Sequence, residues 1–68
     1  MKDLVIADSD VDFSGRLAGH VRFVRRGDAV LYDWTRPDGK VEWASFGDID
    51  QCAMGFMDRL IEHYARMH

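Results

Sequence analysis

The chain has little of what most functional signatures need: its 68 residues contain one cysteine, one proline and three histidines. The lone cysteine, Cys52, has no partner for a disulfide within the chain, so we expect a buried thiol and a reducing compartment. No stretch is long and apolar enough to span a membrane, and the first residues do not have the pattern of a signal peptide. These absences predict a cytoplasmic protein with no membrane partner.

Catalytic and metal-binding signatures are missing as well. Asp8, Asp10 and Asp12 have the spacing with which a calcium loop begins, but Phe13 stands where that loop needs glycine and Gly19 where it needs glutamate. The histidines do not fall at the spacings of a metal site. There is no phosphate-binding loop, nucleophile elbow or dinucleotide fingerprint. We therefore expect no enzyme, no metal and no cofactor.

The residues that are present predict a folded domain. The chain is 47% hydrophobic and 12% aromatic, unlike a disordered segment. Its length predicts a single domain over residues 1–68, near the lower limit at which a hydrophobic core folds unaided, so support from a partner or a homodimer is compatible with its size. The net charge is -3, although the segment 16–40 is locally basic.

The last third of the chain predicts a helix, because apolar residues recur at positions 49, 52, 53, 56, 57, 60, 61 and 64. Asp48 suits its N-cap, with Gln51 three residues on as in a capping box. Gly55 falls on the solvent side of this helix. Three β-rich runs joined by short turns precede it. The predicted fold is α+β, a three- to four-stranded antiparallel meander packed against one C-terminal helix.

Two turns determine the register of the sheet, that is, which residues of neighbouring strands lie opposite each other. Gly27-Asp28 predicts a two-residue hairpin between residues 20–26 and 29–36. In the next hairpin, Asp38-Gly39 as a two-residue loop places Trp34 opposite Trp43, whereas a bulged three-residue loop shifts the pairing by one. We favour the two-residue loop because it gathers the aromatic residues, Trp43 included, on the face that the helix covers.

That register leaves a row of apolar side chains on the face opposite the helix. Such a row on a face that should be solvated predicts either a covering element or a binding patch. The apolar run 4–7 could form a fourth strand or pack over this face. An apolar centre with a mixed-charge rim is typical of a protein interface. We therefore predict a partner-binding site made of Val24, Leu31, Phe46, His20, Arg22, Arg26 and Glu42.

Residues 21–59 also resemble a known kind of DNA-binding domain, the three-stranded sheet plus helix of plant ethylene-response factors. The matching residues are Val21-Arg22-Phe23-Val24-Arg25, Asp33, Gly39-Lys40, Trp43, Phe46, Ala53 and Asp58-Arg59. The arm-type domain of phage integrases is similar in the order of its elements. The resemblance implies that the sheet lies in the major groove and that Arg22 and Arg25 contact DNA. By size and acidic charge alone, the chain is also similar to small phage-encoded inhibitors, including anti-CRISPR proteins.

Two functions follow from these observations. The first is a non-enzymatic protein-binding module of the kind of a phage-type inhibitor, which acts by steric occlusion of a host complex that itself binds nucleic acid. The alternative is a DNA-binding module that uses the face of its sheet. Asp33 and Glu42 would share that face with Arg22 and Arg26 and oppose phosphate, so we favour the protein partner over direct binding to nucleic acid.

Overall fold

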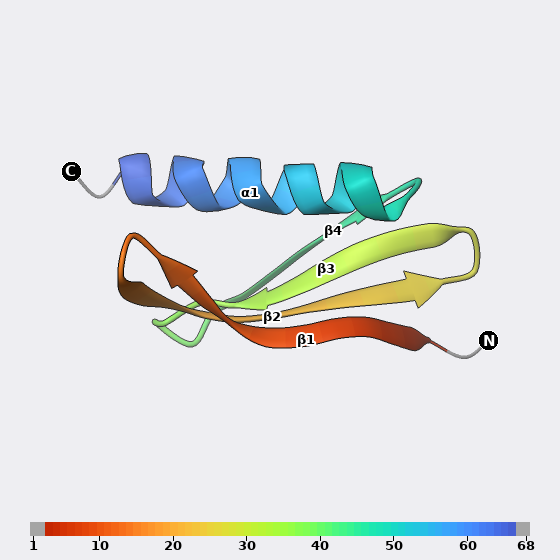
Figure 1. Cartoon of the computed structure of the whole chain (residues 1–68), viewed down its shortest axis with the longest axis horizontal. Coiled ribbons are helices and arrows are strands. Elements are labelled where there is room, and N and C mark those ends of the chain that lie inside the picture. The colour runs from red at the N-terminus through yellow and green to blue at the C-terminus, as the bar shows by residue number, and fades with distance from the viewer. Residues whose placement is uncertain (1–2, 67–68) are drawn as a thin grey trace.

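The computed structural model describes residues 3–66, and it shows the α+β fold that the sequence predicts (Figure 1). Four antiparallel strands form one sheet in chain order, β1 (Leu4–Phe13), β2 (Arg16–Arg26), β3 (Ala29–Thr35) and β4 (Val41–Phe46). The helix α1 (Ile49–Ala65) follows and lies along one face of this sheet, over β3 and β4. Within residues 3–66, no helix has the length and apolar character that crossing a membrane requires.

The apolar run 4–7 belongs to a fourth strand and does not fold over the sheet. It begins β1, which pairs with β2 along its length and contains two register shifts. Val5 lies opposite Val24, in the plane of the sheet. Of the two roles that the sequence left open for this run, the structure therefore has the strand.

The hairpin between β2 and β3 has the predicted register. Arg26 lies opposite Ala29 across the Gly27-Asp28 turn, and Val24 lies opposite Leu31. Gly27 has a φ of 61°, which glycine adopts without the steric cost that a side chain adds. A turn of two residues thus sets the pairing of the two central strands.

The hairpin between β3 and β4 differs from the favoured prediction. Arg36 N donates to Lys40 O at 2.8 Å and Gly39 N donates to Arg36 O at 2.9 Å, so three residues rather than two form the loop. Pro37 suits the first corner of a type I turn because its ring fixes φ, and Gly39, with a φ of 87°, takes the left-handed position that follows. The loop is therefore the bulged three-residue one, and the favoured two-residue loop is wrong.

The change of loop moves every side chain of β4 to the other face of the sheet, because side chains alternate along a strand. Trp34 lies opposite Glu42, and Trp43 lies opposite Asp33. Trp43 is 69% exposed, so its predicted place in the core is wrong. Phe46 takes a place under α1 instead, packed against the core.

The core lies between α1 and the sheet, with Trp34 at its centre as predicted. Trp34 is 0% exposed, its ring packs edge-on against Phe56 with centroids 5.6 Å apart, and its Nε1 donates to the carbonyl oxygen of Ala18 at 2.7 Å. Cys52 is buried here as expected, and burial raises the pKa of its thiol. The other buried residues of this cluster are Val11, Ala18, Val21, Val30, Tyr32 and Leu60.

The start of α1 confirms its predicted cap, while Gly55 has a different role from the one expected. The side chain of Asp48 accepts a hydrogen bond from Gln51 N at 2.8 Å. Gly55 does not face open solvent, since a Cβ at this position would lie 2.2 Å from Cζ of Phe46. The missing side chain lets α1 approach the ring of Phe46.

Candidate protein-binding face

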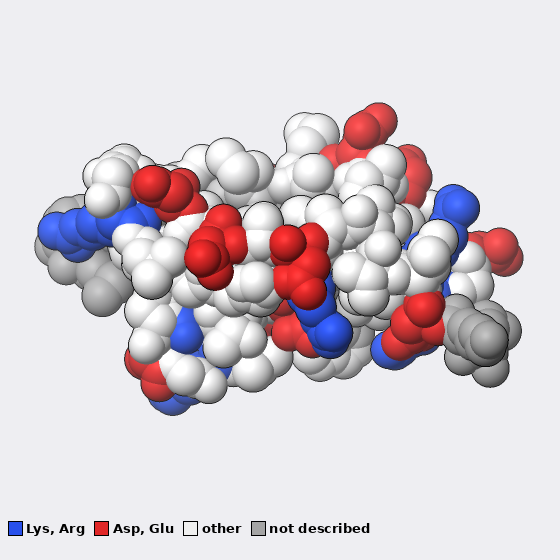
Figure 2. Space-filling model, turned by 60° about the horizontal axis from the view of Figure 1, so that its bottom comes forward, with Lys and Arg blue, Asp and Glu red and all other residues white. Residues whose placement is uncertain are grey.

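The face of the sheet turned away from α1, which we call the outer face, has no helix or strand packed over it among residues 3–66. Figure 2 turns the underside of the molecule, away from α1, toward the viewer. The strand pairings place the following residues on the outer face: Val5, Asp8 and Asp10 of β1, His20, Arg22, Val24 and Arg26 of β2, Leu31, Asp33 and Thr35 of β3, and Val41, Trp43 and Ser45 of β4.

Two of the three predicted apolar residues lie side by side on the outer face. Val24 and Leu31 are directly opposite each other on β2 and β3. They are only 4% and 8% exposed, and they are not part of the core cluster under α1. Val24 and Leu31 therefore lie below the exposed side chains of the outer face and offer little surface to a partner themselves.

The two predicted site residues of β4, Phe46 and Glu42, do not belong to the outer face. Phe46 lies on the α1 side, where its ring stacks on Tyr32 with centroids 6.0 Å apart. Glu42 also points to the α1 side and holds two arginines. Both corrections have one cause, the three-residue loop that shifts β4 by one position.

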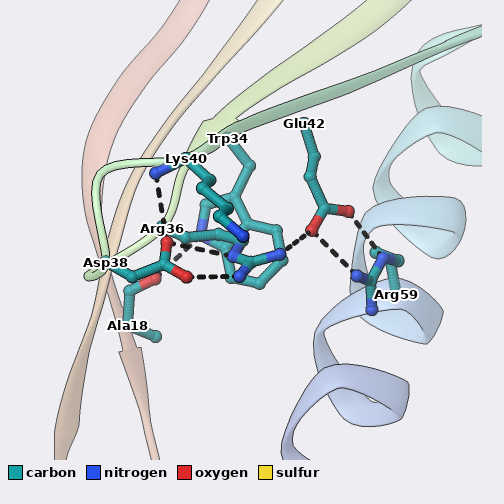
Figure 3. A network of polar contacts seen from close by, with 7 residues as sticks. All are labelled: Ala18, Trp34, Arg36, Asp38, Lys40, Glu42 and Arg59. Atoms are coloured by element: carbon teal, nitrogen blue, oxygen red, sulfur yellow. Dashed lines mark hydrogen bonds and ion pairs between the residues drawn. The ribbon is translucent and has the colours of Figure 1, made fainter.

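Glu42 is the centre of an ion-pair network that joins the β3–β4 hairpin to α1 (Figure 3). Arg59 donates to it from Nε at 2.6 Å and from Nη2 at 2.8 Å, and Arg36 donates from Nη1 at 2.8 Å. Arg36 also pairs with Asp38 in the turn. Burial opposes ionisation of Glu42, but the hydrogen bonds from both arginines outweigh it and lower the pKa of its carboxyl. Glu42 is thus a structural residue.

Trp43 is the large apolar residue of β4 on the outer face, although Ser45 rather than Trp43 stands opposite Leu31, where the prediction had Phe46. It is 69% exposed, and its neighbour on this face, Val41, is 59% exposed. The two line a hollow together with Arg26, Leu31 and Asp33. Sequence reasoning missed Trp43 as a surface residue, although the Pro-Asp-Gly order in the preceding turn is the signal that could have found it.

The arginines of the outer face are each paired with a carboxylate. Arg22 Nη2 lies 3.3 Å from Asp33 Oδ2 on the neighbouring strand. Arg26 holds Asp3 through two hydrogen bonds, 2.9 Å from Nε and 2.8 Å from Nη2. The bonded guanidinium of Arg26 lowers the pKa of Asp3. Neither arginine carries an unmatched positive charge.

His20, the remaining predicted rim residue, lies between two aspartates of β1. Its Nδ1 is 3.0 Å from Asp10 Oδ1, and its Nε2 contacts Asp8. The hydrogen bonds with Asp10 and then Asp8 raise the pKa of the imidazole. A protonated His20 is therefore matched by carboxylates in the same way as the two arginines.

These pairs give the outer face a mixed and balanced charge. In Figure 2, acidic and basic side chains lie beside one another among uncharged residues, and no continuous basic strip crosses this side. Arg25, which the DNA-binding resemblance implies as a contact, is opposite buried Val30 and so faces the α1 side. An extended polyanion finds no row of free cations on the outer face.

The aspartates of β1 have local partners rather than the arrangement of a metal site. Asp8 and Asp10 contact His20, and Asp12 Oδ1 accepts a hydrogen bond from Gly15 N at 3.1 Å. In residues 3–66, no group of three histidine, cysteine or acidic side chains is arranged to hold a metal ion. The chemistry of the outer face is that of apolar contact and paired charges.

Comparisons with protein-family models, curated proteins and solved structures gave no match. The class of the protein is therefore defined by its geometry, a four-stranded antiparallel sheet with one helix on one face and an uncovered outer face.

Proposed function

We propose that the chain is a non-enzymatic protein-binding module that docks a protein partner on the outer face through Trp43. The exposure of Trp43, 69% on a regular strand, is the observation that carries this proposal. Tryptophan is among the residues most enriched at the energetic centres of protein interfaces, because its ring buries a large area at a small cost in conformational entropy. A tryptophan that the fold leaves uncovered is available to a partner.

The surroundings of Trp43 indicate the chemistry of that partner. Val41 and the largely buried Leu31 make the centre of the site apolar. The hollow beside Trp43 accepts one protruding side chain of a partner. The ion pairs of Arg22 and Arg26 make the rim polar without excess charge. The matching surface is a protein with an apolar side chain to fill the hollow and a mixed polar rim around it.

Steric occlusion is the mode of action that fits such a module. A chain of 68 residues that binds through one face affects its partner by covering the surface that this face touches. Inhibition of a host complex, as in the small phage-encoded inhibitors that the chain resembles in size and charge, is consistent with this mode. The identity of the partner stays a prediction.

Direct DNA binding through the outer face is the lesser candidate. Arg22 and Arg26 already pair with Asp33 and Asp3, so each phosphate would have to displace a carboxylate rather than a mobile counterion. Release of counterions is the main source of affinity for duplex DNA, and the carboxylates reduce it. The paired arginines thus favour a protein partner.

Two substitutions of equally exposed apolar residues test the proposal. Trp43 is 69% exposed on the outer face and Met54 is 68% exposed on α1, so Trp43→Asp and Met54→Asp introduce the same charge on opposite sides of the molecule. Tagged wild type and both variants would be cross-linked in nuclease-treated lysate. The partner identified by mass spectrometry would then be purified and its affinity measured for all three proteins.

We expect wild type and Met54→Asp to bind the purified partner alike, and Trp43→Asp to bind at least about tenfold more weakly, as loss of a central interface residue does. Circular dichroism would establish that both variants are folded. Equal binding by Trp43→Asp and wild type, or binding that nuclease abolishes, would refute the protein-binding role of the outer face.

A further inference from the structure

The backbone of β4 has free hydrogen-bonding groups along its outer edge. In an antiparallel pair, alternate residues direct N–H and C=O toward the partner strand, and those between direct them away. The bond from Arg36 N to Lys40 O makes these two residues a bonded pair, so Glu42, Ala44 and Phe46 bond to β3 in turn. Val41, Trp43 and Ser45 therefore direct their N–H and C=O groups outward, where no turn or cap of residues 3–66 takes them up.

β4 also lacks the features with which edge strands avoid pairing with other chains. Edge strands are commonly interrupted by bulges, proline or lysine. The opposite edge strand, β1, has two register shifts and a series of aspartates. β4 pairs with β3 without a shift from Val41 to Phe46 and contains neither proline nor lysine. Its one charged residue, Glu42, is already matched by Arg36 and Arg59.

We infer that β4 pairs antiparallel with β4 of a second copy of this chain, across a twofold axis at Trp43. In this register, Trp43 lies opposite Trp43 of the second copy, and Val41 lies opposite Ser45. These are the residues whose backbone groups point outward, so every free N–H and C=O on them gains a partner. The pairing joins the two sheets into one continuous sheet.

The side chains of β4 select this axis over its neighbours. With the axis at Trp43, Glu42 lies opposite Ala44 of the second copy, and the two tryptophans form a cross-strand aromatic pair on the outer face. An axis at Glu42 would leave Ser45 without a strand partner, because Gly39 of the second copy, which lies outside β4, would stand opposite it. An axis at Ala44 would leave Val41 without a strand partner. The strand is thus complementary to itself in one register.

The dimer rests on the backbone of β4 and not on the partner that we propose for the outer face. It places the outer faces of the two copies side by side and so widens the surface that such a partner would meet. It also suits the size of the chain, because a domain of 68 residues buries a small share of its surface alone.

A pair of double variants tests the inference with the purified chain. Val41→Lys with Ser45→Lys sets lysine opposite lysine across the axis, whereas Val41→Lys with Ser45→Glu sets lysine opposite glutamate. Both keep Trp43 and both make the same change at Val41. Val41 and Ser45 are exposed, so we expect both variants to fold.

Sedimentation equilibrium would give the dimer dissociation constants. We expect wild type to dimerise below about 100 μM, and the lysine–glutamate variant to dimerise at least about tenfold more tightly than the lysine–lysine variant. The difference should shrink in 1 M salt, where the screening length falls to about 3 Å. A wild type that stays monomeric, or two double variants of equal affinity, would overturn the inferred register.

Amide hydrogen exchange provides a readout for the backbone itself. In wild type, the amides of Val41, Trp43 and Ser45 should exchange more slowly as protein concentration rises, while those of Glu42 and Ala44 are protected by β3 at every concentration. Exchange at the three outward amides that does not depend on concentration would rule out pairing along β4. These experiments use the chain alone, so a negative result would not bear on the proposed partner site. A negative result in the partner-binding test would likewise not bear on the pairing of β4.

Discussion

The two tryptophans offer substitutions whose effects on stability should differ by several kcal/mol. Trp34 is 0% exposed, packs against Phe56 and donates a hydrogen bond to Ala18, whereas Trp43 is 69% exposed. Removing a buried tryptophan side chain costs about 3–5 kcal/mol. A domain of this length has a total stability of about 3–10 kcal/mol, so Trp34→Ala should remove at least about a third of it, and should unfold the protein if the total lies at the lower end of this range. Trp43→Ala should change stability by no more than about 0.5 kcal/mol.

Urea denaturation followed by circular dichroism would measure the difference. Trp34→Phe keeps a ring in the core but loses the hydrogen bond to Ala18, and should remain folded at a cost of about 1–3 kcal/mol. In thermal unfolding, each kcal/mol of lost stability corresponds to a decrease of about 4–8 °C in Tm for a domain of this size. Repeating the measurement at several protein concentrations, from about 5 μM upward, would separate any contribution of β4 pairing, because that contribution grows with concentration. In Trp43→Phe the remaining tryptophan should emit at short wavelength, and in Trp34→Phe at long wavelength.

The outcome decides between the two possible registers of β4. If Trp43→Ala lowered stability as much as Trp34→Phe, Trp43 would belong to the core, and the two-residue loop would be the correct one. In the folded Trp43→Phe variant, Trp34 is the remaining tryptophan. Emission at long wavelength from this variant would contradict the burial of Trp34.

Three further substitutions test local features of the fold. Gly55→Ala should lower Tm, because overpacking against the ring of Phe46 costs about 1–3 kcal/mol and outweighs the gain of about 1 kcal/mol in helix propensity. A higher Tm would contradict the close approach of α1 to the ring of Phe46. Glu42→Gln should cost about 1–3 kcal/mol at pH 7. The lowered pKa of Glu42 confers stability that is present above its ordinary value of 4.5 and lost as pH falls through the folded value, so wild type and variant should converge in acid denaturation curves. NMR titration should place the pKa of His20 above 6.5, and Asp10→Asn should lower the pKa of His20. The stability that comes from the raised pKa is fully present below pH 6.5. It is lost as pH rises through the pKa of His20 in the folded protein. A His20 pKa that Asp10→Asn left unchanged would show that the contact with Asp10 does not form in solution.

Much of the fold could be predicted because it depends on local patterns. The helical period of residues 49–64 and the capping side chain of Asp48 predict α1, and the structure has both. Gly27-Asp28 predicts the hairpin that sets Val24 opposite Leu31. The burial of Trp34 follows from its place in the alternation of β3. Each of these features is fixed within a few residues, so the sequence carries it directly.

The candidate site was predicted only in part, because its members come from strands whose pairing is decided elsewhere. His20, Arg22, Val24, Arg26 and Leu31 lie on the outer face as expected. The carboxylates that match the charge of His20 come from β1, and Asp3, which matches Arg26, directly precedes β1; no short sequence pattern reveals how this segment pairs with β2. The electrical balance of the face therefore depends on contacts between distant segments.

The sequence by itself determined α1, the three β-rich runs before it and the way β2 pairs with β3, since turn chemistry and hydrophobic period act locally. Only the tertiary structure decided the face to which Glu42, Trp43 and Phe46 belong. Two loops of different length were compatible with the same five residues, Arg36 to Lys40, and they differ by one position in the pairing of β4. Side chains alternate along a strand, so that one position placed Trp43 on the outer face instead of in the predicted core, and Phe46 against the core instead of on the outer face.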